Sequence, residues 1–215
     1  MRSTKLRHLS AVLSGNASAG LVSAVVVRYQ KARPWTTGQS RRVRWWGVLA
    51  LIGLMSVVVG LVGRLRMNYT RSLPIGLYWT VRDGPVPRGS TVLVCLPESV
   101  ALFARERGYL WRGSCPASAA PVGKLVLATE GDVVGLTEAG FAVNGRLMPR
   151  TEPMQADSKG RRVAHYPYGI YRVGRNEVWL YSPYHPLSFD SRYFGPVPTA
   201  NVASRIVAIW TTSSR

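Results

Sequence analysis

Residues 45–63 of the chain read WWGVLALIGLMSVVVGLVG, nineteen residues without a charged side chain. At about 1.5 Å per residue, a helix of this length spans roughly 28 Å, close to the ~30 Å hydrocarbon core of a bilayer. Trp45 and Trp46 stand at one end, as interfacial aromatic residues do, and Arg64 and Arg66 follow the other end. A core helix of a soluble domain would carry a polar stripe, and this stretch has none. We therefore expect a single transmembrane helix over 45–63.

Basic residues are unevenly distributed around this helix. The chain has 28 Lys and Arg against 10 Asp and Glu, a net charge of +18, and residues 1–44 contain no acid. Six basic residues lie in the twenty positions before the helix and four in the twenty after it. The positive-inside rule then predicts that 1–44 is a cytoplasmic tail, poorly ordered and close to anionic lipid. No nucleic-acid-binding motif accompanies the charge, so nucleic acid is not an expected partner.

Residues 64–215 are expected to form an exported domain, and they carry mainly strand signals. Asn144-Gly145 is typical of a tight hairpin turn, and Gly174-Arg175-Asn176 indicates a second hairpin between the segments that flank it. A single helix is expected over 98–107, because Glu98 opens it and Gly108 follows it. Short β-branched or apolar segments predict strands at 91–96, 124–128, 132–136, 141–148, 169–173, 177–181 and 205–211. The pattern favours a mainly β domain with one short helical excursion.

Cys95 and Cys115 lie on either side of that helix. An even number of cysteines in an exported domain is compatible with a disulfide, which would close the excursion, and two free thiols remain the alternative. The three histidines and two cysteines are dispersed without metal-ligand spacing, so no metal and no cofactor is expected.

Ser72 and Lys124 are the residues with the clearest potential for chemistry. Ser72 lies nine residues beyond the anchor, so it stays within about 30 Å of the bilayer surface, and Pro74 prevents a continuing helix there. The exported domain has seventeen arginines but only two lysines. Lys124 opens an apolar strand, where burial would lower its pKa enough for a general base, whereas Lys159 lies in a polar loop. The alternatives are an ordinary loop serine and a lysine that extends to solvent.

A histidine is the alternative candidate for the catalytic base. His165 and His185 are the histidines of the exported domain, and His185 lies five residues before Asp190. A Ser-His-Asp triad would need His185 as its base. The sequence leaves open whether His185 has that role or a supporting one.

Three blocks of sequence resemble the TraF-type conjugative-transfer signal peptidases, which belong to the bacterial type I leader peptidase family. Residues 68–78 (NYTRSLPIGLY) are similar to the nucleophile box of that family. Residues 121–124 (PVGK) with 130–134 (EGDVV) are similar to its lysine box and Gly-Asp turn. Residues 188–198 (SFDSRYFGPVP) resemble its C-terminal Asp-Ser-Arg block. The blocks follow in family order behind an N-terminal anchor, so the resemblance extends from the anchor nearly to the C-terminus.

This resemblance implies a leader-peptidase-like all-β catalytic domain and a role for each matching residue. Ser72 would be the nucleophile and Lys124 the general base. The Ser72 amide and the Thr70 hydroxyl would form the oxyanion hole, and Ser188 would orient the lysine amine. Asp190 and Arg192 would brace the site as a structural pair.

The implied function is a membrane-anchored serine endopeptidase of the bacterial inner membrane, with a periplasmic catalytic domain. Its partners would be membrane lipids and precursor proteins with leader peptides, above all a conjugative prepilin cleaved after small residues. Whether water or an amine resolves the acyl-enzyme stays open. A housekeeping leader peptidase and a non-catalytic scaffold of the transfer apparatus are the alternatives.

Overall fold

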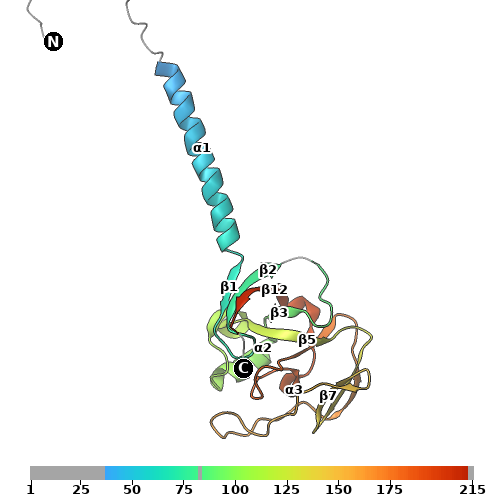
Figure 1. The fold of residues 1–215 in the computed structure, drawn as a ribbon. Helices are drawn as coiled ribbons and strands as arrows, with labels where there is room; N and C mark the ends of the chain where they lie inside the picture. The colour runs from blue at the N-terminus through green and yellow to red at the C-terminus, as the bar shows by residue number, and fades with distance from the viewer. Residues whose placement is uncertain (1–36, 82–83, 213–215) are drawn as a thin grey trace, which may run out of the picture. The chain divides into compact units, whose positions relative to one another are not determined.

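A computed structural model describes residues 37–81 and 84–212 (Figure 1). Helix α1 (Thr37–Val62) contains the apolar stretch, and its portion Val43–Val62 has a mean hydropathy of 2.3 with no part of it buried. It is long and apolar enough to cross a membrane. The helix also includes residues 37–44, which the sequence pattern assigned to the tail. No proline interrupts them, so the intrahelical hydrogen bonding can begin earlier. Residues 1–36 of the predicted tail lie outside the described part.

The part of the chain that follows α1 contains two antiparallel sheets. A seven-stranded sheet has the order β1-β2-β12-β3-β5-β10-β11, and a four-stranded sheet has the order β8-β7-β6-β9. The strands of the large sheet are β1 (Leu65–Asn68), β2 (Gly76–Val81), β3 (Thr91–Val94), β5 (Val122–Ala128), β10 (Glu177–Tyr181), β11 (Val197–Pro198) and β12 (Val202–Thr211). Those of the small sheet are β6 (Val133–Thr137), β7 (Gly140–Val143), β8 (Arg146–Leu147) and β9 (Gly169–Arg172), while β4 (Arg112–Cys115) lies outside both. This confirms the prediction of a mainly β domain.

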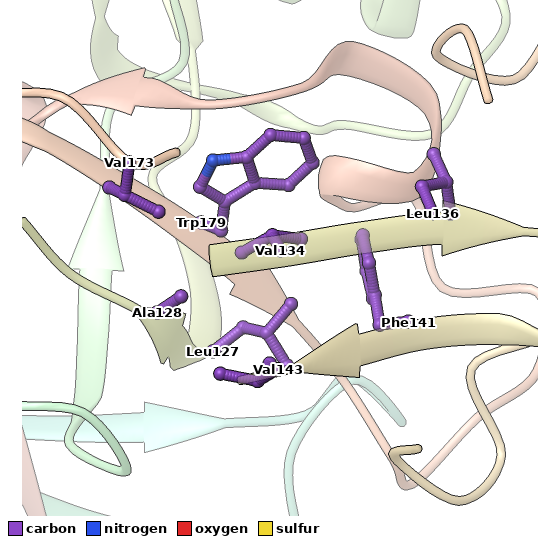
Figure 2. Close-up of a cluster of buried hydrophobic side chains, with 8 residues drawn as sticks. All are labelled: Leu127, Ala128, Val134, Leu136, Phe141, Val143, Val173 and Trp179. Carbon is purple, nitrogen blue, oxygen red and sulfur yellow. The ribbon is translucent and has the colours of Figure 1, made fainter. Parts of the chain in front are cut away.

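One hydrophobic cluster joins the two sheets. Leu127 and Trp179 come from β5 and β10 of the large sheet, and Val134 and Phe141 come from β6 and β7 of the small one. The rings of Phe141 and Trp179 meet edge to face, with centroids 5.8 Å apart. Figure 2 shows the eight buried side chains of this cluster together. Their burial fixes the small sheet against the end of β5, the strand that begins near Lys124.

Two predicted turns have different outcomes. The Asn144-Gly145 turn is present: both residues have positive φ, 49° and 80°, and Val143 pairs with Arg146 across it. The predicted hairpin between 169–173 and 177–181 is wrong, because β9 pairs with β6 whereas β10 pairs with β5 and β11. The Gly174-Arg175-Asn176 segment instead carries the chain from the small sheet to the large one.

The helical excursion is helix α2 (Glu98–Glu106), which nearly matches the predicted 98–107. A disulfide joins Cys95 to Cys115 and closes the excursion. Ala101 of α2 packs against Cys115 in a small core of its own. Two short 3-10 turns, Pro116–Ser118 and Thr199–Asn201, and helix α3 (Ser191–Phe194) complete the elements.

Candidate active site

Asn68 organises the turn that carries Ser72. It ends β1, and its side-chain amide donates to the carbonyl oxygens of Thr70 (2.8 Å), Leu73 (3.0 Å) and Pro74 (3.1 Å). Its Oδ1 accepts hydrogen bonds from the Thr70 main-chain nitrogen (3.2 Å) and the Thr70 hydroxyl (2.8 Å). One asparagine thus satisfies five polar groups of a turn that lies outside regular structure.

Close packing holds this turn against β5. Leu73 is 2% exposed and clusters with Tyr78 and Ile206. A Cβ atom on Gly123 would lie 2.6 Å from the Leu73 Cδ1, nearer than such atoms ever approach. Any other residue at position 123 would require the end of the Leu73 side chain to move, so glycine here allows the observed packing of the Ser72 turn against β5.

Ser72, Lys124 and Ser188 lie within hydrogen-bond distance of one another. Lys124 Nζ is 3.1 Å from Ser72 Oγ and 2.5 Å from Ser188 Oγ, and the two serine oxygens are 3.1 Å apart. Lys124 is only 2% exposed. Burial lowers its pKa from 10.5 to about 8, a shift that nearby Asp190 opposes and Arg192 reinforces. The lysine is therefore poised to exchange a proton with Ser72 near neutral pH.

Asp190 and Arg192 form a fully buried, bidentate ion pair beside these groups. Arg192 Nε donates to Oδ1 of Asp190 and Nη2 to Oδ2, each at 2.8 Å. The guanidinium also donates to the carbonyl oxygens of Ser188 (3.0 Å), Pro186 (3.2 Å) and Glu152 (3.0 Å). The donors of Arg192 thus hold in place the segment that carries Ser188.

Ser182 is a site residue that the sequence did not indicate. It is 1% exposed, and its hydroxyl donates to the Ser72 main-chain carbonyl at 2.6 Å. Its main-chain nitrogen donates to Asp190 Oδ2 at 3.1 Å. Ser182 therefore links the buried ion pair to the turn that carries Ser72. A serine after a strand, in Tyr181-Ser182-Pro183, has no local pattern that distinguishes it from an ordinary loop serine.

The histidines are placed differently. His185 lines the cleft at Ser72, and desolvation, followed by the charges of Arg71, Lys124 and Arg192, lowers its pKa from 6.5. Within the described chain, no hydrogen bond joins the His185 ring to Ser72 or Asp190, so the geometry gives the triad no support. His165 stacks on Tyr168 and lies outside the residues that line the cleft.

The cleft above Ser72 has a volume of about 590 Å³. Thr70, Ser72, Lys124 and Ser188 are among its lining residues, together with Tyr109 and Trp111 of the disulfide-closed excursion. Its volume and mainly apolar lining suit a stretch of peptide. In the described residues, no three His, Cys, Asp or Glu side chains gather where they could hold a metal ion.

Comparison with known proteins agrees with this arrangement. The family model described as signal peptidase, peptidase S26, matches residues 41–211. Two plasmid transfer proteins TraF of Escherichia coli are 37% and 41% identical, over 76% and 68% of this chain and 93% and 82% of their own. A probable conjugal transfer protein TraF of Sinorhizobium fredii is 38% identical over 76% of this chain and 89% of its own.

A solved signal peptidase I of Enterococcus faecalis aligns with 59% of this chain and all of its own, at 18% identity and a TM-score of 0.35. The family match covers most of the chain, and the relatives are matched over most of their own length. The chain therefore belongs to the peptidase S26 family of signal peptidases.

Proposed function

We propose that this protein is a membrane-anchored serine endopeptidase that removes leader peptides by a Ser72–Lys124 acyl-enzyme mechanism. The observation that carries the proposal is a buried lysine amine, 2% exposed, whose nitrogen lies 3.1 Å from a serine hydroxyl, both in the lining of a cleft of about 590 Å³. Arginine in the same place would stay protonated, and an exposed lysine would rarely be neutral.

The reaction begins with neutral Lys124 taking the proton of Ser72. The Ser72 oxygen attacks the scissile carbonyl carbon, and the carbonyl becomes an oxyanion in a tetrahedral intermediate. When this collapses, Lys124 returns the proton to the departing amine, leaving an ester on Ser72. A water molecule that loses a proton to Lys124 then hydrolyses the ester and restores the serine. Ser188 accepts a hydrogen bond from the amine throughout and keeps its lone pair directed at Ser72.

The oxyanion would be stabilised by the Ser72 main-chain N–H and the Thr70 hydroxyl. In the free protein the Thr70 hydroxyl donates to Asn68 Oδ1 at 2.8 Å. This hydrogen would have to turn toward the oxyanion when the substrate binds. Asn68 retains the Thr70 main-chain N–H as a donor, so the turn itself need not change.

The relatives named for plasmid and conjugal transfer support a transfer-pilus precursor, such as a prepilin, as the substrate. The Cys95–Cys115 disulfide supports an oxidising, periplasmic compartment for the catalytic domain. The excess of basic residues before the apolar stretch 45–63 supports a cytoplasmic N-terminus and a single crossing of the inner membrane.

Membrane lipids are proposed as a second partner. Four successive residues of β12, from Val207 to Trp210, are exposed, and Val207, Ile209 and Trp210 are each more than half exposed. Both faces of this part of β12 thus expose apolar side chains to water. Contact with the surface of a bilayer would remove these side chains from water.

The test uses the full-length protein in detergent micelles with a purified prepilin as substrate. Wild type should release the mature product, and Ser72→Ala and Lys124→Ala should each be inactive. Lys159→Ala, which alters an exposed lysine, is the matched control and should remain active. Cleavage by both Ser72→Ala and Lys124→Ala would refute the Ser–Lys mechanism. A wild-type protein that folds normally but cleaves neither prepilin nor other leader-bearing precursors would favour a scaffold.

A further inference from the structure

The charges that line the cleft do not balance. Arg66, Arg71 and Lys124 are its cationic lining residues, and Asp157 is its one acid among the described residues. The Asp157 side chain is 7% exposed and already engaged: it accepts from Arg161 Nε and the Tyr109 hydroxyl, each at 2.7 Å. Although desolvation opposes it, these hydrogen bonds lower the Asp157 pKa below its usual range. The cleft therefore keeps an uncompensated positive charge.

Arg71 is the guanidinium best placed to use that charge. It immediately precedes Ser72, is exposed and lines the cleft. No hydrogen bond or ion pair within the described residues engages its side chain. Arg66 differs, because its guanidinium donates to the carbonyl oxygens of Gly63 (3.0 Å) and Leu65 (2.9 Å). Arg71 thus has free donors beside the nucleophile.

The charge of Arg71 also acts on His185, another lining residue of the cleft. After desolvation, the charge of Arg71 is the largest cause of the lowered pKa of His185, ahead of those of Lys124 and Arg192. This lowering disfavours the charged form of His185, whereas Arg71 keeps its charge. A guanidinium with free donors binds a carboxylate through two parallel hydrogen bonds, which few other groups match.

We propose that Arg71 binds a carboxylate of the substrate, so that the cleft selects precursors with Asp or Glu within a few residues of the scissile bond. The inference rests on the proposed function and names one feature of its substrate class. Because a charge-assisted, bidentate pair is stronger than a hydrogen bond to a neutral amide, a matching acid should raise kcat/KM by about 10- to 100-fold over its amide.

The experiment uses full-length protein in zwitterionic detergent and synthetic leader peptides with an Ala-x-Ala cleavage site. Glu is placed in turn at each of three positions on either side of the scissile bond, and each peptide is paired with its Gln counterpart. The wild type should show a Glu-over-Gln preference at one or two adjacent positions. Arg71→Gln should reduce this Glu-over-Gln ratio to about one. Arg71→Glu should instead prefer a peptide with Lys at the same position. Arg112→Gln, an exposed arginine outside the cleft lining, should keep the wild-type ratio.

The outcomes separate this inference from the proposed function. If the wild type cleaves Glu and Gln peptides equally at all six positions while Ser72→Ala is inactive, the carboxylate site is refuted and the peptidase stands. If Ser72→Ala cleaves as well as the wild type, both are refuted. In a second arm with phosphatidylglycerol vesicles, loss of activity in Arg71→Gln on Glu and Gln peptides alike would mean that Arg71 binds lipid headgroups, and the substrate site would be wrong.

Discussion

The pH dependence of cleavage follows directly from the buried amine of Lys124. With its pKa lowered to about 8, the neutral fraction is about 1% at pH 6, 10% at pH 7 and 90% at pH 9. A lysine with the ordinary value of 10.5 would be about 0.03% neutral at pH 7, so burial enriches the reactive form roughly 300-fold. The value of kcat/KM, which reports the free enzyme, should therefore rise about tenfold per pH unit up to about pH 7, about fivefold more by pH 8, and level off above about pH 9.

The assay measures initial cleavage rates between pH 5.5 and 10 with a leader peptide that does not titrate in this range. Lys124→Arg should lose about 10²- to 10⁴-fold in kcat, since a guanidinium keeps its proton. Lys159→Arg should reproduce the wild-type profile. His185→Asn tests whether histidine contributes to the pH profile. The pKa of His185 is lowered from 6.5, so its removal should leave the rise in rate with a midpoint near pH 8 unchanged. A rate independent of pH from 6 to 9, a midpoint near 10.5, or an active Lys124→Arg would refute the reasoning.

The same burial has a cost in stability. Lys124 keeps its proton up to about pH 10.5 in the unfolded chain but only up to about pH 8 in the folded one. Burial of the protonated amine therefore lowers the free energy of unfolding by its full amount below pH 8, and this loss diminishes as the pH rises to 10.5. The difference corresponds to about 3 kcal/mol at about 1.36 kcal/mol per pH unit. Lys124→Met should be inactive yet raise the free energy of unfolding at pH 7 by up to about 3 kcal/mol, measured by the fluorescence of buried Trp179. A Met variant less stable than the wild type at pH 7 would contradict this.

Three further predictions concern the support of the site. Asp190→Ala leaves Arg192 charged and buried without its carboxylate, so unfolding should become easier by about 3–5 kcal/mol; an unchanged denaturation midpoint would contradict it. Ser182→Ala removes the 2.6 Å hydrogen bond to the nucleophile's carbonyl, so kcat should fall about tenfold with little change in KM, and Thr should restore most of it. Replacing Cys95 and Cys115 by Ser should cost about 2–4 kcal/mol in thermal unfolding, an effect that reductant should reproduce in the wild type.

Local patterns predicted the elements whose signals lie within a few residues. The strand at 177–181 coincides with β10, and the helix predicted at 98–107 differs from α2 by one residue. Strand β10 and helix α2 each have an apolar face and residues at their ends that favour termination. The local preference of the sequence and the burial of side chains therefore favour the same element. Strands β1, β2, β4 and β11 were not predicted. β2 does alternate between buried and half-buried residues, so its signal was missed, and β11 has only two residues. β4 is exposed at three of its four residues, and β1 has no buried residue, so neither carries the alternation that marks a half-buried strand.

The sequence by itself determined the apolar helix, the β-rich domain after it and the two residues, Ser72 and Lys124, with reactive potential. Only the tertiary structure decided that Lys124 is buried beside Ser72, that β9 and β10 belong to different sheets, and that Ser182 reaches the nucleophile turn. The helix and strands follow from contacts between residues near in sequence. The burial of an amine and the pairing of strands depend on side chains that fifty to more than a hundred residues of chain separate, and a pattern along one segment does not contain them.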